Sequence, residues 1–131
     1  MTTTATPKPM LWTGRVLSGL FVAFMVMDLT MKLLNLKVVA DTMAQMGWPT
    51  DKARLLGALQ LIGVGLYIYP RTAVLGTVLV TAYLGGAVAT HLRIDSPLLS
   101  HILFGVYLGV IAWAGLWLRD ARLQSLFPWR R

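Results

Sequence analysis

Four long apolar runs constrain the fold of this chain more than any other feature. They cover residues 11–34, 53–69, 72–92 and 98–118. A helix that crosses the hydrocarbon core of a bilayer, which is about 30 Å thick, needs roughly 20 mostly apolar residues. The composition agrees with a membrane protein, because 56% of the residues are hydrophobic and only 13% are charged. We therefore expect an all-α integral membrane four-helix bundle.

Short turns between these runs predict the topology. Pro70 and Arg71 separate the second run from the third, and residues 93–97 (RIDSP) separate the third from the fourth. Because such short turns can only join neighbouring antiparallel helices, the bundle is expected to run up-down-up-down. The longer connection at 35–52 contains apolar residues at roughly helical spacing, which indicates a short interfacial helix between the first two spans: Val38, Val39, Met43 and Met46.

The four runs form one predicted domain over residues 11–123. Residues 1–10 (MTTTATPKPM) are polar and contain prolines, so they are expected to form a mobile N-terminal tail. Residues 124–131 are expected to form a basic C-terminal tail. The first run is interpreted as a retained span, because it carries Asp28 and Lys32 near its end and no signal of the small-x-small type follows promptly.

The basic residues are distributed in a way that suits a membrane surface. The chain has 12 Lys and Arg against five acidic residues, for a formal net charge of +7. These cations stand singly between apolar runs rather than in one patch, which favours phospholipid headgroups as partners and argues against nucleic acid. Seven lie on the side of the termini and five on the other, a bias that favours cytoplasmic termini: Lys8, Arg15, Arg71, Arg119, Arg122, Arg130 and Arg131 against Lys32, Lys37, Lys52, Arg54 and Arg93.

Polar side chains gather toward the end of the predicted bundle that is opposite the termini. Because the spans alternate in direction, late residues of the first and third runs lie level with early residues of the second and fourth. An ionisable group at membrane depth costs about 2.5–3.5 kcal/mol on insertion scales and is therefore a functional candidate. The candidate ligand-binding residues are Asp28, Lys32, Gln60, Tyr83, Gly86, His91, Arg93 and His101.

Each candidate also has a structural explanation. Asp28 and Lys32 lie one helical turn apart, in the order that favours an ion pair. Lys32 and Arg93 are long enough to reach headgroups, and the two histidines can satisfy one another. A two-histidine metal or haem site would need further ligands at a recognisable spacing, so no metal is predicted. We expect His91 to face the bundle interior, within reach of Asp28, Lys32, Gln60 or His101.

Glycines on the third and fourth spans predict close helix packing. Gly85 and Gly86 are adjacent on the third span, and Gly105 and Gly109 form a GxxxG pair on the fourth. Helices in lipid associate through small residues that let backbones approach. The GxxxG pair is accordingly a candidate surface for a homodimer. The chain has no cysteine, which excludes disulfides, thiolate catalysis and cysteine-ligated zinc or iron–sulfur sites.

The third span and its flanks resemble a known family. The segment YPRTAVLGTVLVTAYLGGAVATHLR at 69–93, with GRVLSGLFVAFMVMDLTMKL before it and WLRDARL after it, is similar to the DoxX-like proteins, small bacterial membrane proteins with four predicted spans. The most specific parts are the Pro-Arg-Thr turn at 70–72, Tyr-x-Gly-Gly at 83–86 and Thr-His-x-Arg at 90–93. The resemblance implies a four-helix bundle in the bacterial inner membrane. It also implies a link to quinone-coupled sulfur oxidation or to membrane oxidoreductase assemblies.

Three functions are compatible with these features. The first is a protein that binds a small lipophilic ligand, with a quinone as the candidate, as an accessory part of a membrane oxidoreductase system. Here Lys32, Tyr83 and His91 would donate to the ligand in a groove floored by Gly85 and Gly86. The second is a membrane-embedded acid–base enzyme of the isomerase or hydrolase type, with Asp28 as base and His91 as acid, although no GxSxG or HExxH motif is present. The third is an oligomeric small-solute transporter or a helper of other membrane proteins. The sequence specifies no cofactor.

Overall fold

The computed structural model describes residues 7–130, and the predictions for residues 1–6 and for Arg131 lie outside this range. The described chain is helical and contains no strand. Its longer helices are α1 (Lys8–Leu33), α3 (Ala53–Ile68), α4 (Ala73–Arg93) and α5 (Phe104–Arg119). Two shorter helices are α2 (Lys37–Gln45) and α6 (Ala121–Leu126). Single helical turns lie between them: η1 (Thr50–Lys52), η2 (Pro70–Thr72) and the π-helical η3 (Leu98–Ile102).

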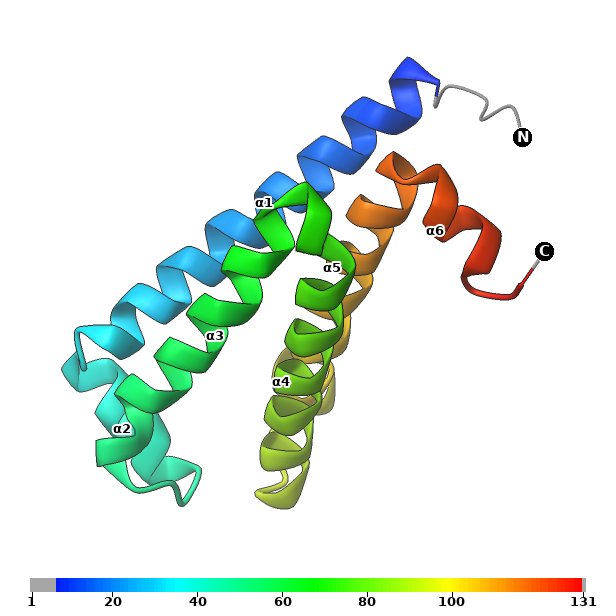
Figure 1. Cartoon of the computed structure of the whole chain (residues 1–131). Coiled ribbons are helices and arrows are strands. Elements are labelled where there is room, and N and C mark those ends of the chain that lie inside the picture. The colour runs from blue at the N-terminus through cyan, green and yellow to red at the C-terminus, as the bar shows by residue number, and fades with distance from the viewer. Residues whose placement is uncertain (1–6, 131) are drawn as a thin grey trace.

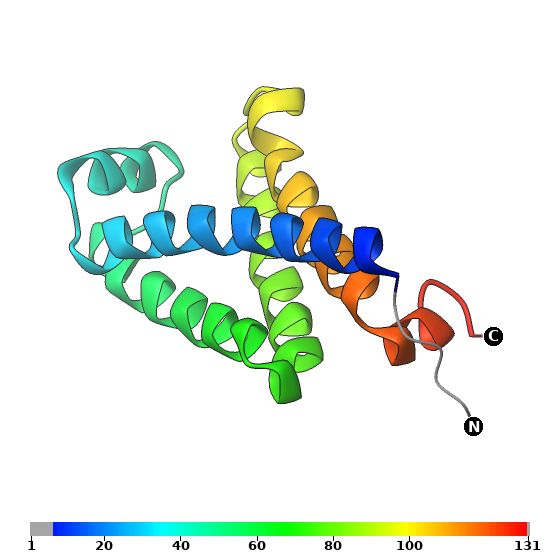
Figure 2. The ribbon, with the colours of Figure 1, turned by 90° about the horizontal axis from the view of Figure 1, so that it is seen from above.

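The four longer helices form a closed ring of contacts. Helix α1 packs against α3 and α5, and α4 packs against the same two helices. The chain runs along them in alternating directions, so the predicted all-α bundle is confirmed (Figure 1). The start of α1 and helix α6 lie at one end of the bundle, which we call the terminal end. Helix α2 and the turn between α4 and α5 lie at the other end, which we call the loop end (Figures 1 and 2).

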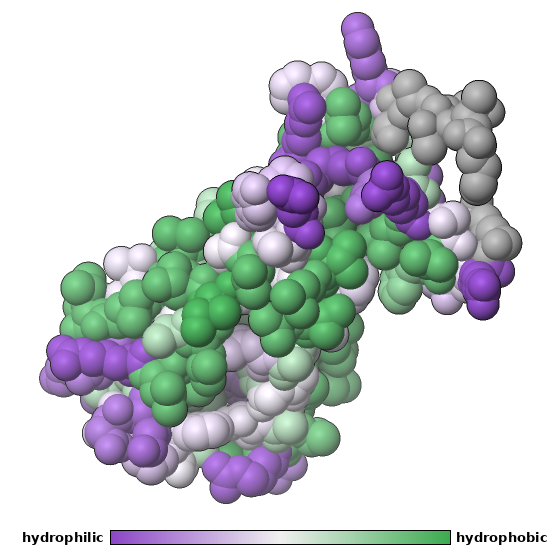
Figure 3. Space-filling model, in the orientation of Figure 1, coloured by the Kyte–Doolittle hydropathy of each residue, from purple (hydrophilic) through white to green (hydrophobic). Residues whose placement is uncertain are grey.

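The lengths and compositions of the helices identify a multi-pass membrane protein. Three helical segments in the described part of the chain are long and apolar enough to cross a membrane, namely Lys8–Leu33, Pro70–Arg93 and Leu98–Arg119. Helix α3, the second of the four predicted spans, has 16 residues, about 24 Å of helix. Large apolar side chains cover the outside of the bundle between its ends, where Figure 3 shows a hydrophobic surface with hydrophilic residues near the ends. This surface matches a lipid environment.

The helix boundaries differ from the predicted ones at both termini. Helix α1 begins at Lys8, three residues before the predicted span, and has Pro7 as its N-cap. Proline fits the start of a helix because the first N–H groups have no intrahelical acceptor. At the other terminus, α6 extends to Leu126 after Asp120, whose side chain accepts hydrogen bonds from the backbone N–H groups of Arg122 and Leu123. Residues 8–10 and 124–126, predicted as parts of tails, are therefore helical.

The predicted short helix between the first two spans is also present. It is α2, a nine-residue helix whose one buried residue is Met43. Its hydrophobic side therefore contacts the bundle through Met43, while most of its other side chains are exposed or half-buried. Placement of α2 at a membrane interface remains a prediction.

The predicted close packing at Gly105 is confirmed, because a Cβ there would lie 2.9 Å from Val88 Cγ2 and 3.1 Å from the Leu84 backbone oxygen on α4. Two even closer helix contacts use glycines that were not predicted. A Cβ added at Gly76 on α4 would lie 2.2 Å from the backbone nitrogen of Tyr67 on α3. One added at Gly115 on α5 would lie 2.4 Å from Ser18 Oγ on α1. The prediction that Gly85 and Gly86 serve helix packing is wrong, because a Cβ at either position meets no atom within 4 Å. A four-residue spacing identifies one face of a helix, but it does not reveal which face a neighbour covers.

A chain of hydrogen bonds joins three helices near the terminal end. Tyr67, which is 2% exposed, donates to the carbonyl oxygen of Ala112 at 2.9 Å. Because the tyrosine proton is used there, the 2.7 Å contact between Ser18 and Tyr67 has Ser18 as its donor. Arg119 in turn donates to Ser18 Oγ at 2.9 Å. This chain connects α1, α3 and α5, so the terminal end of the bundle is closed by polar contacts as well as by packing.

Candidate functional site

A cavity of about 400 Å³ lies toward the loop end of the bundle. There the pair α1 and α3 diverges from the pair α4 and α5 (Figures 1 and 2). The cavity lining comes from all four of these helices, from the helical turn η3, and from α2 and the loop that follows it. Seven of the eight predicted site residues lie on its wall: Asp28, Lys32, Gln60, Tyr83, Gly86, His91 and His101.

Four of these residues form one hydrogen-bonded cluster, the Lys32 network, which consists of Asp28, Lys32, Gln60 and Tyr83. The ammonium nitrogen of Lys32 lies 2.6 Å from Asp28 Oδ2, 3.0 Å from Gln60 Oε1 and 2.7 Å from Tyr83 Oη. A lysine ammonium has three protons to donate, and these contacts use all of them. The network thereby joins α1, α3 and α4.

Gln60 completes the network from α3. Its amide nitrogen donates to Asp28 Oδ2 at 3.0 Å and to the carbonyl oxygen of Met25 at 3.2 Å. Gln60 is 1% exposed, so its amide needs these partners. Its carbonyl oxygen faces the Lys32 ammonium, which fixes the orientation of the amide. Gln60 thus acts as a two-sided bridge between the acid and the base of the ion pair.

The spacing of Asp28 and Lys32 on α1 explains why the two charges meet. They are four residues apart and form an ion pair at 2.6 Å. The Lys32 side chain is 18% exposed and that of Asp28 is 35% exposed, so the pair borders the cavity without being sealed from it. Mutual neutralisation and the added hydrogen bonds offset the cost of placing two charges inside a membrane helix. The Lys32 network consequently carries no net charge.

The two histidines form a second polar group on the same cavity. His91, on α4, has its Nδ1 3.1 Å from Ser96 Oγ, and His101, on η3, has its Nδ1 2.8 Å from Ser100 Oγ. Their ring centroids are 5.7 Å apart, with an angle of 69° between the planes. His91, which is half-buried, therefore lies against the exposed His101 on the cavity wall. Within residues 7–130, no group of three or more histidine, cysteine or acidic side chains could hold a metal ion.

Arg93 is the predicted site residue that does not line the cavity. Its guanidinium donates to the carbonyl oxygen of Met46 in the loop after α2. It also lies next to Gly47, whose positive φ of 77° allows this loop to turn. Arg93 thus connects the end of α4 to the segment that covers the cavity, and its contacts are those of a structural residue.

The apolar part of the cavity wall was not identified from the sequence. It includes Phe24 and Phe104, whose rings meet edge to face at 5.1 Å, and Leu108. Met43 and Met46 of the α2 segment complete it on the side of the loop end. In the sequence these residues resemble the many other apolar residues of the spans. Only the helical spacing of the two methionines indicated that they share a face.

The polar residues of the cavity all fall within the part of the chain that matches a known family. Neither curated proteins nor solved structures give a significant match to this sequence. The sequence profile of the DoxX-like family matches residues 16–115, which include the whole Lys32 network and both histidines. Since this match covers most of the chain, the protein is a member of the DoxX-like family.

Proposed function

We propose that this protein binds a small, uncharged amphiphilic molecule, with a quinone as the first candidate, in the cavity lined by the Lys32 network. The observation that carries the proposal is that the Tyr83 hydroxyl accepts a hydrogen bond but donates none to the residues that the structure describes. Lysine can only donate, so Tyr83 Oη is the acceptor of the 2.7 Å bond from Lys32. Within residues 7–130, the Tyr83 proton has no acceptor. It is available to an oxygen of a ligand in the cavity.

The histidines supply a second group of ligand contacts. Both use Nδ1 for a neighbouring serine, so Nε2 is the ring nitrogen that each has left for a ligand. His91 and His101 line the same cavity as Tyr83. A quinone has two carbonyl oxygens and an apolar ring, and this wall offers separate polar groups between apolar side chains.

The charge balance supports an uncharged ligand. The Asp28 carboxylate and the Lys32 ammonium neutralise one another at 2.6 Å, and every ammonium proton is already donated. An anionic ligand would have to displace Asp28, which would leave a carboxylate unpaired at membrane depth. The cavity volume of about 400 Å³ is within the range of roughly 300–1,000 Å³ that is typical of small-molecule sites.

Two adjacent glycines on α4 allow a matched test of the cavity. A Cβ at Gly86 or at Gly85 meets no atom within 4 Å, but only Gly86 lines the cavity. In lipid nanodiscs, titration calorimetry with short-tailed ubiquinone and menaquinone analogues should detect binding to the native protein. Gly86→Leu should weaken this binding at least tenfold by filling the cavity, whereas Gly85→Leu should leave it unchanged. No binding of either quinone, or equal effects of the two substitutions, would refute the proposal.

The hydroxyl of Tyr83 can be tested by a second matched pair. Tyr83→Phe removes the proposed donor and retains the ring, so quinone affinity should fall by about 5- to 50-fold, as expected for one lost hydrogen bond of about 1–2.5 kcal/mol. Tyr107→Phe is the control, because Tyr107 is 42% exposed on α5 and does not line the cavity. An unchanged affinity of Tyr83→Phe would remove Tyr83 from the site.

We further propose that ligand binding serves a membrane oxidoreductase system in which this protein is an accessory subunit in the bacterial inner membrane. The chain has no cysteine with which to hold an iron–sulfur cluster or to form a redox-active disulfide, so electron transfer to a bound quinone would depend on a partner. Crosslinking in native membranes, followed by assays of quinone reduction with and without this protein, tests the association. A reductase activity that is unaffected by deletion of the protein would contradict it.

A further inference from the structure

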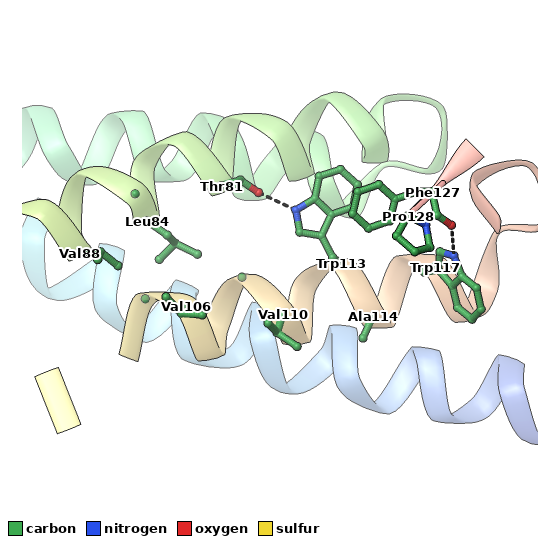
Figure 4. A pocket seen from close by; sticks show the side chains of 13 residues that line it. Thr81, Leu84, Val88, Val106, Val110, Trp113, Ala114, Trp117, Phe127 and Pro128 are labelled. Atoms are coloured by element: carbon green, nitrogen blue, oxygen red, sulfur yellow. Dashed lines mark hydrogen bonds between the residues drawn. The ribbon is translucent and has the colours of Figure 1, made fainter. Parts of the chain in front are cut away.

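A second hollow lies between α4 and α5, and we call it the α4–α5 groove. Its volume is about 550 Å³. Figure 4 shows side chains of both helices along it, with Val88 and Val106 toward one end and Trp113 and Trp117 toward the other. Gly85 lines this groove, whereas Gly86 lines the cavity described above. Since adjacent helical residues point about 100° apart, the groove and the cavity lie on different faces of α4.

The groove has no free polar group within residues 7–130. The hydroxyl of Thr81 donates to the carbonyl oxygen of Thr77 at 2.7 Å and accepts the indole N–H of Trp113 at 2.8 Å. The indole N–H of Trp117 donates to the carbonyl oxygen of Phe127 at 2.8 Å. A polar occupant would lose its own hydrogen bonds with water and gain none here. The groove is therefore suited to hydrocarbon.

The C-terminal segment closes the groove toward the terminal end. The ring of Phe127 stacks on that of Trp113, with centroids 4.9 Å apart and an angle of 11° between the planes. Pro128 lies beside this stack (Figure 4). Both residues follow the 16–115 region that matches the family. An occupant that runs along the groove consequently ends at, or turns outward at, this aromatic wall.

The length of the groove favours a lipid chain over a transmembrane helix. Along α5 it extends from Gly105 to Trp117, which corresponds to about 18 Å of helix. One leaflet contributes half of the hydrocarbon thickness of about 30 Å, so an acyl chain occupies a depth of about 15 Å. A crossing helix of a second protein would need about twice the length of the groove and would meet the Phe127–Pro128 wall.

The terminal end of the bundle, toward which the groove closes, carries an excess of positive charge. Among the described residues of the terminal end there are six basic side chains and one acidic side chain, Asp120. The loop end has five basic and four acidic side chains and is nearly balanced. Arg122 and Arg130 are exposed and lie in the chain on either side of Phe127 and Pro128. The basic residues of the terminal end are Lys8, Arg15, Arg71, Arg119, Arg122 and Arg130.

From these observations we infer that the α4–α5 groove binds one acyl chain of an anionic phospholipid from the leaflet at the terminal end, with the lipid phosphate held by Arg122 and Arg130. The apolar lining selects the chain, and the aromatic wall marks the end of the groove at which the chain turns outward to its headgroup. The arginines select an anionic headgroup, because a basic side chain near the membrane surface attracts anionic lipid with about 1 kcal/mol. This lipid site is separate from the proposed quinone cavity and does not depend on it.

Native mass spectrometry tests the lipid site directly. The protein is released from nanodiscs that contain equal amounts of phosphatidylglycerol and phosphatidylcholine with the same acyl chains. The native protein should retain phosphatidylglycerol in preference to phosphatidylcholine. Gly85→Leu should reduce the retained phosphatidylglycerol at least fivefold by filling the groove, whereas Gly86→Leu, on the other face of α4, should retain as much as the native protein.

The headgroup contact is tested by a charge-matched pair of double variants. Arg122→Gln with Arg130→Gln should lower the preference for phosphatidylglycerol by roughly 30-fold, as expected from about 1 kcal/mol for each arginine. Lys37→Gln with Lys52→Gln removes the same charge from exposed positions at the loop end and should leave the preference unchanged. Equal retention of the two lipids by the native protein would overturn the inference. So would equal loss in both glycine variants, or a dimer that Gly85→Leu dissociates.

Discussion

The ammonium nitrogen of Lys32 on α1 lies 2.7 Å from the phenolic oxygen of Tyr83 on α4, although 51 residues separate the two in the chain. This contact crosses the side of the bundle where the two helix pairs diverge. Because Asp28 and Gln60 bind the same ammonium, one side chain holds three helices in register around the cavity. The stability of the loop end should therefore depend on Lys32 more than on any other polar residue there.

Lys32→Met should destabilise the protein by about 2 kcal/mol, because it leaves the Asp28 carboxylate without its counter-charge at membrane depth. Unfolding in mixed detergent micelles, followed by circular dichroism, measures the change. The double variant with Asp28→Asn should be more stable than Lys32→Met alone, since it removes both charges. A double variant that is less stable than Lys32→Met would show that the ion pair does not account for the loss.

Tyr67→Phe should cost about 1–3 kcal/mol of stability, because it removes the hydroxyl that connects Ser18 to Ala112 and leaves buried polar atoms without partners. The same substitution at Tyr107, which is exposed on α5, should change stability by less than about 0.5 kcal/mol. Both can be measured as detergent unfolding midpoints. Equal midpoints for the two variants would mean that the hydrogen-bond chain contributes nothing.

Gly76→Ala should destabilise the bundle by about 1–3 kcal/mol, because the new methyl group would collide with the backbone of Tyr67 and no side-chain rotation can relieve it. Gly85→Ala, on the same helix, meets no atom within 4 Å and should be neutral or slightly stabilising, since alanine favours helix over glycine. Thermal unfolding of the two variants compares them directly. A stable Gly76→Ala protein would contradict the close approach of α3 and α4.

Single cysteines should report the orientation in the membrane, since the chain has none of its own. If the termini are cytoplasmic, as the distribution of basic residues predicts, an impermeant maleimide should label Thr50→Cys but not Ser125→Cys in intact cells. Thr50 is exposed at the loop end, and Ser125 is exposed on α6. After lysis both should be labelled. The opposite pattern in intact cells would reverse the orientation.

The helices and the polar side chains at the loop end could be predicted, because the signals for both lie between residues that are close in the sequence. Runs of about 20 apolar residues and the four-residue spacing of Asp28 and Lys32 are visible along the chain. The alternation of spans placed Gln60, Tyr83 and the histidines at one end of the bundle. The partner of Lys32 on α4 could not be predicted, since it depends on how far the helix pairs diverge.

The same limit explains why the sequence did not identify the glycines of closest packing or the contact that Arg93 makes. Every span contains small residues, so periodicity could not separate Gly76, which meets Tyr67, from Gly86, which faces open space. Arg93 lies next to the site residues in sequence, yet the end of α4 directs it to the loop after α2. The aromatic wall of the groove was not predicted either, because it forms only when the C-terminal segment folds back and stacks Phe127 on Trp113.

Leu84 and Gly105 line both the cavity and the α4–α5 groove. A Cβ at Gly105 would lie 3.1 Å from the backbone oxygen of Leu84, so the two compartments share a thin partition of helix backbone. Any factor that a lipid on one side applies to the affinity for a ligand on the other side must be returned equally by that ligand, and the unchanged affinities expected for the Gly85 and Gly86 controls place this factor near one.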